Sequence, residues 1–325
     1  MRIRIDNLTN RKGGGDEAQP GPVLSTWMRA LRLHFVLPSI LPALLGGVIA
    51  WAHGYPMHLF HFVLVVIGVT VNHLGLNLVD DVLDYRHAVD LQKGEEKNFF
   101  TGGSGVLTEG LLKDTQMLKA AVLFFGMTVV IGVYLTYACG WPVLVLGLFG
   151  MACSIFYTAP PIRFGYRGFG ELGLLVNFGP VIVLGSYYVQ ARAFSCEPLI
   201  ASLVPGFMMW AMIIINEIPD YETDRNGGKW NLVARFGRQA GAVLYGAGLA
   251  IAYGVLTIAG LAKILSPFVL LGLVSLPLAV KSFVVMKRHL ENPLAMAPAN
   301  LAMIKVHGLT GAAMIVAYLI EGIFP

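Results

Sequence analysis

Long runs of apolar residues, separated by short polar segments, make up most of the chain. They lie near residues 33–52, 59–79, 117–138, 142–158, 170–190, 199–218, 239–261, 265–285 and 301–322. A helix that crosses the hydrocarbon core of a bilayer needs about 20 apolar residues. The pattern therefore predicts an all-α polytopic membrane protein in which about nine transmembrane helices form one domain over residues 26–325.

The composition supports a lipid environment. Hydrophobic residues make up 56% of the chain and charged residues only 13%, whereas charged residues make up about 25% of a typical soluble domain. Residues 1–25 are polar and interrupted by glycine and proline, without the apolar segment and small-residue cleavage site of a signal peptide. We expect them to form a disordered cytosolic tail; an ordered cap on the cytosolic face is the alternative.

Basic residues are distributed unevenly among the loops. If the N-terminus is inside, the loops after the second, fourth, sixth and eighth apolar runs hold Arg86, Lys93, Lys97, Lys113, Arg163, Arg167, Arg225, Lys229, Arg235, Arg238, Lys287 and Arg288. The opposite loops hold only Arg192 and Lys263. This bias predicts a multi-pass protein of the cytoplasmic membrane with its N-terminus inside. Charges spread over four membrane-facing loops do not favour nucleic-acid binding, and no protein partner is evident.

Acidic residues are rare and concentrated in two clusters. The first comprises Asp80, Asp81, Asp84 and Asp90, and the second comprises Glu217, Asp220, Glu222 and Asp224. Each cluster lies at the predicted cytosolic end of an apolar run. Carboxylates so close to hydrocarbon are costly, so they indicate a functional site.

Helical geometry groups these acids with two asparagines. At about 100° per residue, one face of the first helix, about 60° wide, carries Asn77, Asp81 and Asp84, with Asp80 at its border. One face of the second, about 80° wide, carries Asn216, Asp220 and Asp224, whereas Glu217 and Glu222 point elsewhere. Carboxylates on one face repel each other unless a cation lies between them, and oxygen ligands suit Mg²⁺ bound to substrate phosphates. These six residues are the predicted metal ligands.

Helix-end solvation and ion transport are the alternatives to a metal site. Acids at a membrane boundary can simply face water at the end of a helix. Intramembrane acids also mark ion pathways in secondary transporters, but those usually lie near the middle of the membrane. Both clusters here lie at one edge, which favours a site for a charged substrate that carries a long apolar tail.

Four segments resemble the UbiA superfamily of intramembrane prenyltransferases, and more closely its naphthoate-prenylating, MenA-like branch. They are Asn77-Leu-Val-Asp-Asp-Val-Leu-Asp-Tyr85 with Asp90, Thr101-Gly-Gly-Ser-Gly-Val-Leu107, Tyr157-Thr-Ala-Pro-Pro161 with Gly165–Glu171, and Asp220-Tyr-Glu-Thr-Asp-Arg-Asn-Gly-Gly-Lys-Trp-Asn-Leu232. The chain departs from that branch at Asp80, where Asn is usual, and at Ala88 and Asn231, where Gly and often Thr stand. These departures bear on the identity of the acceptor.

The resemblance implies transfer of a prenyl group from an isoprenyl diphosphate to an aromatic acceptor, 1,4-dihydroxy-2-naphthoate in menaquinone biosynthesis. Hydroxybenzoate, homogentisate or a glycerol lipid are the alternative acceptors. The catalytic residues would be Asp81, Asp84, Asp220, Asp224 and Tyr157, with Mg²⁺ as cofactor, and the diphosphate-binding residues would be Lys97, Arg163 and Lys229. Positive-inside bias explains the three cations equally well, and an interfacial aromatic belt explains the tyrosine.

The second and sixth helices would bring the two acidic motifs together in a cytosol-facing chamber. The glycine-rich loop 102–105 would cover this chamber, and the prenyl tail would lie in an apolar groove open to lipid.

Overall fold

The computed structural model describes residues 23–87, 98 and 100–324, and the regular secondary structure in this part of the chain is all helical, without strands. Most of the predicted tail lies outside the described residues; the first helix, α1 (Val23–Ala30), begins within its last three positions. Asp90 and Lys97 also lie outside the described residues.

The remaining elements follow one another in a single bundle. In chain order they are η2 (Leu33–Phe35), α2 (Leu37–Ala52), α3 (Leu59–Arg86), α4 (Asp114–Cys139), α5 (Trp141–Phe156), η4 (Phe164–Arg167), α6 (Gly170–Val176), η5 (Asn177–Val181), α7 (Ile182–Ala191), α8 (Cys196–Glu217), α9 (Tyr221–Asn226), α10 (Leu232–Phe236), α11 (Arg238–Leu261), η6 (Pro267–Ser275), α12 (Leu276–Arg288) and α13 (Pro293–Ile323).

The prediction of an all-α membrane protein is confirmed. Within the described residues, seven helical segments are long and apolar enough to cross a membrane: α3, α4, α6 to α7, α8, α11, η6 to α12, and α13. The apolar runs near 33–52 and 142–158 correspond to α2 and α5, which have 16 residues each and are shorter than a standard span. The count of nine crossings therefore stays a prediction.

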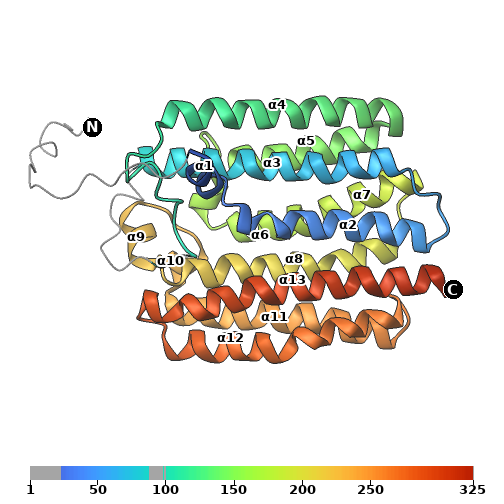
Figure 1. The fold of residues 1–325 in the computed structure, drawn as a ribbon. Coiled ribbons are helices and arrows are strands. Elements are labelled where there is room, and N and C mark those ends of the chain that lie inside the picture. Colours follow the sequence, from blue (N-terminus) through green and yellow to red (C-terminus); the bar gives the residue numbers. More distant parts are fainter. Residues whose placement is uncertain (1–22, 88–97, 99, 325) are drawn as a thin grey trace, which may run out of the picture.

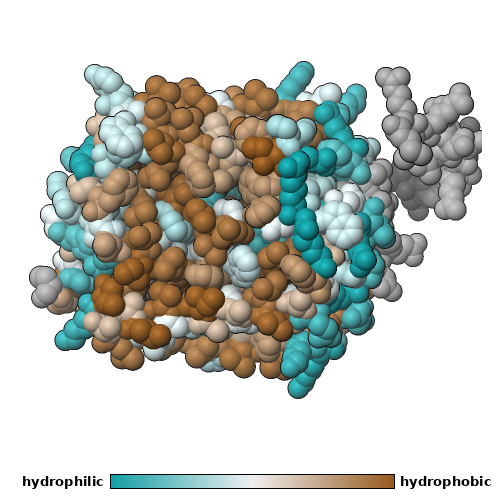
Figure 2. Space-filling model, turned by 180° about the vertical axis from the view of Figure 1, so that it is seen from behind, coloured by the Kyte–Doolittle hydropathy of each residue, from teal (hydrophilic) through white to brown (hydrophobic). Residues whose placement is uncertain are grey.

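The long helices lie side by side, and the short helices α1, α9 and α10 gather at one end of the bundle (Figure 1). We call this the α9 end; the C-terminus lies at the opposite end (Figure 1). Figure 2 shows a broad apolar band across the bundle with hydrophilic residues concentrated at the α9 end. Helix α4 also carries exposed apolar side chains such as Val122, Val130 and Val133. Such a surface suits contact with lipid tails rather than water.

Helix α8 occupies the centre of the bundle because small residues let its neighbours approach closely. A Cβ atom on Gly206 would lie 2.9 Å from the backbone oxygen of Leu175, and one on Gly179 would lie 2.6 Å from the oxygen of Ser202. Close packing through glycine is typical of helix contacts in membranes. It brings the π-helical turn η5 onto α8 and fixes Phe178, which lines the cavities described below.

Candidate active site

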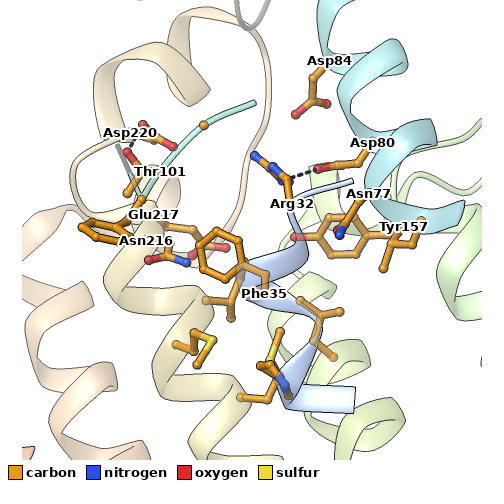
Figure 3. Close-up of a pocket in the computed structure, with 18 of the residues that line it drawn as sticks. Arg32, Phe35, Asn77, Asp80, Asp84, Thr101, Tyr157, Asn216, Glu217 and Asp220 are labelled. Atoms are coloured by element: carbon orange, nitrogen blue, oxygen red, sulfur yellow. Dashed lines mark hydrogen bonds and ion pairs between the residues drawn. The ribbon is translucent and has the colours of Figure 1, made fainter. Parts of the chain in front are cut away.

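A cavity lies between α3 and α8 at the α9 end. It encloses about 1000 Å³, its open mouth included. Figure 3 shows Asn77, Asp80 and Asp84 of α3 on one wall, opposite the side chains that come from the end of α8 and the turn after it. Those on the opposite wall are Asn216, Glu217, Asp220 and Asp224, joined by Lys229. Two acidic walls that are far apart in sequence thus face one space.

Neighbouring hydroxyl groups hold the carboxylates of α3. The Tyr166 hydroxyl donates to Asp84 Oδ1 at 2.5 Å, and the Thr158 hydroxyl donates to Asp80 Oδ1 at 2.5 Å. Burial and the adjacent charge of Asp84 raise the pKa of Tyr166, so it remains a neutral donor. Such bonds from a second layer of residues fix the direction in which carboxylate oxygens point.

The structure places Asp81 differently from the sequence prediction. Its side chain is buried and accepts the Ser104 backbone N–H at 3.0 and 3.2 Å, whereas Asp80 lines the cavity. Both residues flank the line from Asn77 to Asp84 on the helix, so periodicity alone does not choose between them. Asp81 instead anchors the glycine-rich loop, of which Gly102 reaches the cavity.

The second acidic motif does not lie on one continuous helix. The prediction that Asn216, Asp220 and Asp224 share one helical face was therefore wrong. Helix α8 ends at Glu217, two residues before Pro219, and Asp220 precedes α9. Proline disfavours helical conformation in the residue before it and cannot donate its own backbone hydrogen bond. Glu217, the last residue of α8, was predicted to point elsewhere but lines the cavity. Glu222 does point away, toward Arg238 at 3.3 Å.

Polar side chains also support the α8 wall. The Thr101 hydroxyl donates to Asp220 Oδ1 at 3.1 Å (Figure 3). Asn231 Nδ2 donates to Asp224 Oδ2 at 2.7 Å, while its Oδ1 accepts the Ala234 N–H and caps α10. The sequence identified Asn231 only as a departure from the family pattern; in the structure it orients a carboxylate.

Asn216 is held from the side of α13. Asn300 Nδ2 donates to Asn216 Oδ1 at 2.8 Å and to the Ile215 backbone oxygen at 3.1 Å. Asn98 Nδ2 donates in turn to Asn300 Oδ1 at 3.1 Å. This chain of amides connects Asn98, α13 and the α8 wall of the cavity.

Two cationic side chains face the cavity. Lys229 Nζ lies 3.1 Å from Asp84 Oδ2; burial alone would lower its pKa, but the charges of Asp84, Asp224 and Asp80 prevail and raise it, so the amine stays protonated. Arg32, which the sequence prediction missed, has a φ of 50° and lies 3.8 Å from Asp80 and 3.7 Å from Asp81. Positive φ is uncommon for a residue with a side chain, and here it accompanies a place in the cavity wall.

Of the other two predicted phosphate-binding cations, the structure describes Arg163. The Arg163 guanidinium stacks on the Tyr166 ring, 4.2 Å from its centroid, and so lies behind the carboxylate wall. Lys97 is outside the described residues. Tyr157, in contrast, is buried and lines the cavity.

A second, mainly apolar cavity of about 860 Å³ adjoins the first. Its walls come from α3, α4, α5 and the α6 to α7 segment. His73, Leu76 and Phe178 line both cavities. A polar chamber at the α9 end therefore continues into an apolar space within the bundle.

The oxygen-rich walls fit a hard divalent cation bound together with an anionic substrate. Among the described residues, no three His, Cys, Asp or Glu side chains come close enough to hold an ion by themselves. Mg²⁺ characteristically takes one or two carboxylates and completes its shell with water and substrate phosphates. Each acidic wall offers such carboxylates beside an asparagine, so the residues present fit this mode of binding.

Comparison with known proteins agrees with this geometry. Residues 39–304 match the UbiA prenyltransferase family. The chain belongs to this family. This UbiA-family prenyltransferase is 28% identical to the 1,4-dihydroxy-2-naphthoate octaprenyltransferase of Bacillus subtilis over 284 residues, which is 86% of this chain and 88% of the relative. It is 24% identical to the 2-carboxy-1,4-naphthoquinone phytyltransferase of Synechocystis over 294 residues, which is 90% of this chain and 92% of that one.

The fold is also that of solved members of the family. A UbiA homolog from Archaeoglobus fulgidus, solved with DMAPP and Mg²⁺, superposes with a TM-score of 0.61 at 16% identity, over 92% of this chain and all of that one. At this identity, the likeness establishes the shared architecture of the prenyltransferase family.

Proposed function

We propose that this protein transfers a prenyl group from an isoprenyl diphosphate to 1,4-dihydroxy-2-naphthoate, with the two acidic walls holding the diphosphate through Mg²⁺. The observation that carries the proposal is the junction of the two cavities. One end presents oxygen ligands and Lys229, and the other is apolar and extends into the bundle. Only a substrate with an anionic head and a long apolar tail matches both parts.

Both walls would contribute to binding the head group. Asn77, Asp80 and Asp84 would bind Mg²⁺ from one side, and Asp80 takes the role that the sequence analysis assigned to Asp81. Asn216, Asp220 and Asp224 would serve the other. Mg²⁺ bound between them would neutralise negative charge on the leaving diphosphate. Lys229 stands beside Asp84 and can turn its ammonium group toward phosphate oxygens.

Departure of the diphosphate breaks the allylic C–O bond, and the bonding electrons leave with the oxygen. The remaining allylic cation is attacked by an electron-rich ring carbon, and the ring is restored when the attacked carbon loses its proton. Tyr157, which lines the cavity, presents an aromatic ring to this region (Figure 3). An aromatic face attracts a cation, so we assign Tyr157 to stabilising the allylic cation.

The proposed acceptor is supported by the names of the relatives, and the proposed location is supported by the distribution of basic residues. The Bacillus subtilis relative is named for a dihydroxynaphthoate acceptor, and the Synechocystis relative for a carboxynaphthoquinone. The segments at the α9 end carry basic residues such as Arg163, Arg225 and Arg235. Positive loops face the cytosol, so we place the site at the cytosolic face of the cytoplasmic membrane.

The direct test is transfer by the purified protein. In detergent or liposomes with Mg²⁺, a panel of prenyl diphosphates and the acceptors dihydroxynaphthoate, hydroxybenzoate, homogentisate and glycerol phosphate should yield prenylated naphthoate by mass spectrometry. A prenylated product from another acceptor and none from the naphthoate would contradict the acceptor assignment and leave the family activity intact.

Blocking the apolar cavity should shorten the tail that the enzyme accepts. Gly147 of α5 lines this cavity, and a Cβ atom there would meet no other atom within 4 Å. We therefore expect Gly147→Leu to lower kcat/KM for long-chain prenyl diphosphates about 10-fold or more, since every 1.4 kcal/mol of lost binding is a factor of ten, and to spare the shortest. Competition between chain lengths, read by mass spectrometry, measures the effect.

Gly126→Leu is the matched control for this change. Gly126 lies on α4 and, like Gly147, is exposed with open space around its Cβ position, but it does not line the cavity. Its chain-length profile should equal that of the wild type. An unchanged profile in Gly147→Leu as well would show that the tail lies elsewhere.

A further inference from the structure

His73 lies where the acidic chamber meets the apolar cavity. It is on α3, one helical turn before Asn77, and therefore on the same side of the helix. The residue is buried but lines both cavities. Its ring meets Phe178 edge to face, with centroids 5.2 Å apart. A polar ring is thus held at the point where the diphosphate head ends and the prenyl tail begins.

The hydrogen bonds around the ring define which nitrogen carries the proton. Ser39 Oγ lies 2.8 Å from the Val36 carbonyl oxygen and 3.0 Å from His73 Nδ1. A carbonyl oxygen can only accept, and a hydroxyl has one hydrogen to donate. Both bonds form together only if Ser39 donates to the carbonyl and accepts from His73 Nδ1–H. The neutral imidazole then keeps its lone pair on Nε2.

This lone pair has no hydrogen-bond partner within the described part of the protein. The chamber beside His73 has apolar walls, which include Phe35, Phe178 and Met212. Such walls suit a flat aromatic ring. A buried acceptor nitrogen is costly unless something donates to it, and the substrate that carries ring hydroxyl groups can do so.

We propose that His73 Nε2 accepts a hydrogen bond from a hydroxyl group of the aromatic acceptor and so places the ring next to the allylic carbon. The inference rests on the proposed function and adds the acceptor subsite to it. The class of ligand is a hydroxylated aromatic ring that donates an O–H group. Ser39 takes part as a positioning residue, because its hydroxyl keeps the proton on Nδ1 and the lone pair on Nε2.

Replacement of the His73 imidazole by another aromatic ring tests the hydrogen bond without creating a cavity. His73→Phe keeps an aromatic ring and removes both nitrogens, and we expect it to lower kcat/KM for the acceptor about 10-fold or more, the cost of about 1.4 kcal/mol. KM for the prenyl diphosphate should stay within about twofold. His73→Gln offers an acceptor oxygen near the position of Nε2 and should recover part of the loss. Ser39→Ala should give a smaller loss in the same parameter.

An altered acceptor separates hydrogen bonding from packing. Methylation of the acceptor hydroxyl removes its donor, so the wild-type enzyme should lose about the same factor with the methyl ether as His73→Phe loses with the natural acceptor. His73→Phe should show the same kcat/KM for the methyl ether as for the natural acceptor, because the variant and the methyl group each remove the same hydrogen bond. Release of diphosphate with water as the acceptor, which needs no aromatic ring, shows in each variant that the site is folded.

The outcomes distinguish this inference from the proposed function. If wild-type protein transfers no prenyl group to any aromatic acceptor, the proposed function fails. If the wild type is active but His73→Phe alters prenyl diphosphate KM as much as acceptor KM, His73 has only a structural role. The inference is also overturned if replacing the natural acceptor by its methyl ether lowers kcat/KM by the same factor in the wild type and in His73→Phe.

Discussion

Asp84→Asn is expected to lower the rate of prenyl transfer by about 10²–10³-fold, as is usual when an electrostatic group that acts in the transition state is removed. Asp84 lies on the α3 wall, where it accepts from the Tyr166 hydroxyl and pairs with Lys229. An asparagine keeps the shape of the side chain but removes the negative charge, so the wall holds a divalent cation less well. Steady-state kinetics at saturating Mg²⁺ and prenyl diphosphate would measure the loss.

Asp220→Asn should behave like Asp84→Asn, since it lies on the opposite wall and is held in the same way, by the Thr101 hydroxyl. Glu222→Gln is the matched control. Glu222 belongs to the same acidic cluster, but its side chain is 64% exposed and faces Arg238 outside the cavity. The control should keep nearly full activity. Equal losses in Asp220→Asn and Glu222→Gln would contradict the assignment of the cavity as the active site.

Removal of divalent metal should abolish turnover, and added Mg²⁺ should restore it. Four carboxylates face the cavity in addition to Glu217, and without a cation they would repel a diphosphate. Among the described residues, Lys229 and Arg32 supply two positive charges at the same surface. Dialysis of the purified protein against EDTA, followed by Mg²⁺ titration with product detection, measures the requirement.

Calcium provides a control for this experiment, because it prefers more ligands at longer distances than Mg²⁺ does. We expect weaker activity at the same concentration. Full transfer after exhaustive dialysis against EDTA would refute metal-assisted departure of the diphosphate. A transporter would instead move solute or protons across sealed liposomes without any prenyl substrate, and this assay separates the two classes.

Much of the architecture follows from the sequence because lipid imposes a simple requirement on each segment. Apolar runs such as 59–79 and 199–218 became α3 and α8, and each ends in an acidic motif. The helical face of α3 was also informative, since α3 continues unbroken through Asp84. Long, uncharged helices have few alternatives inside a bilayer, so these features were open to prediction.

Other features depend on tertiary contacts that one sequence does not reveal. Asp80 and Asp81 are nearly equivalent by periodicity, but in the structure Asp81 accepts the backbone N–H of Ser104 and Asp80 lines the cavity. Glu217 lines the cavity beside Asn216, although the face drawn through Asp220 and Asp224 excluded it, because α8 does not continue to those two residues. A residue such as His73 in an apolar helix carries no local signal, since its role depends on Ser39 and Phe178, which come from other elements.

The Asp81–Ser104 contact has a consequence for the thermodynamics of substrate capture. Because a carboxylate already holds the glycine-rich loop in place, and because Arg29 bonds the Ser104 carbonyl oxygen at 2.7 Å, the loop is ordered before any ligand arrives. The conformational entropy that a loose loop would lose on binding is therefore lost during folding instead. A preorganised rim of this kind allows a larger part of the substrate's interaction energy to appear as affinity.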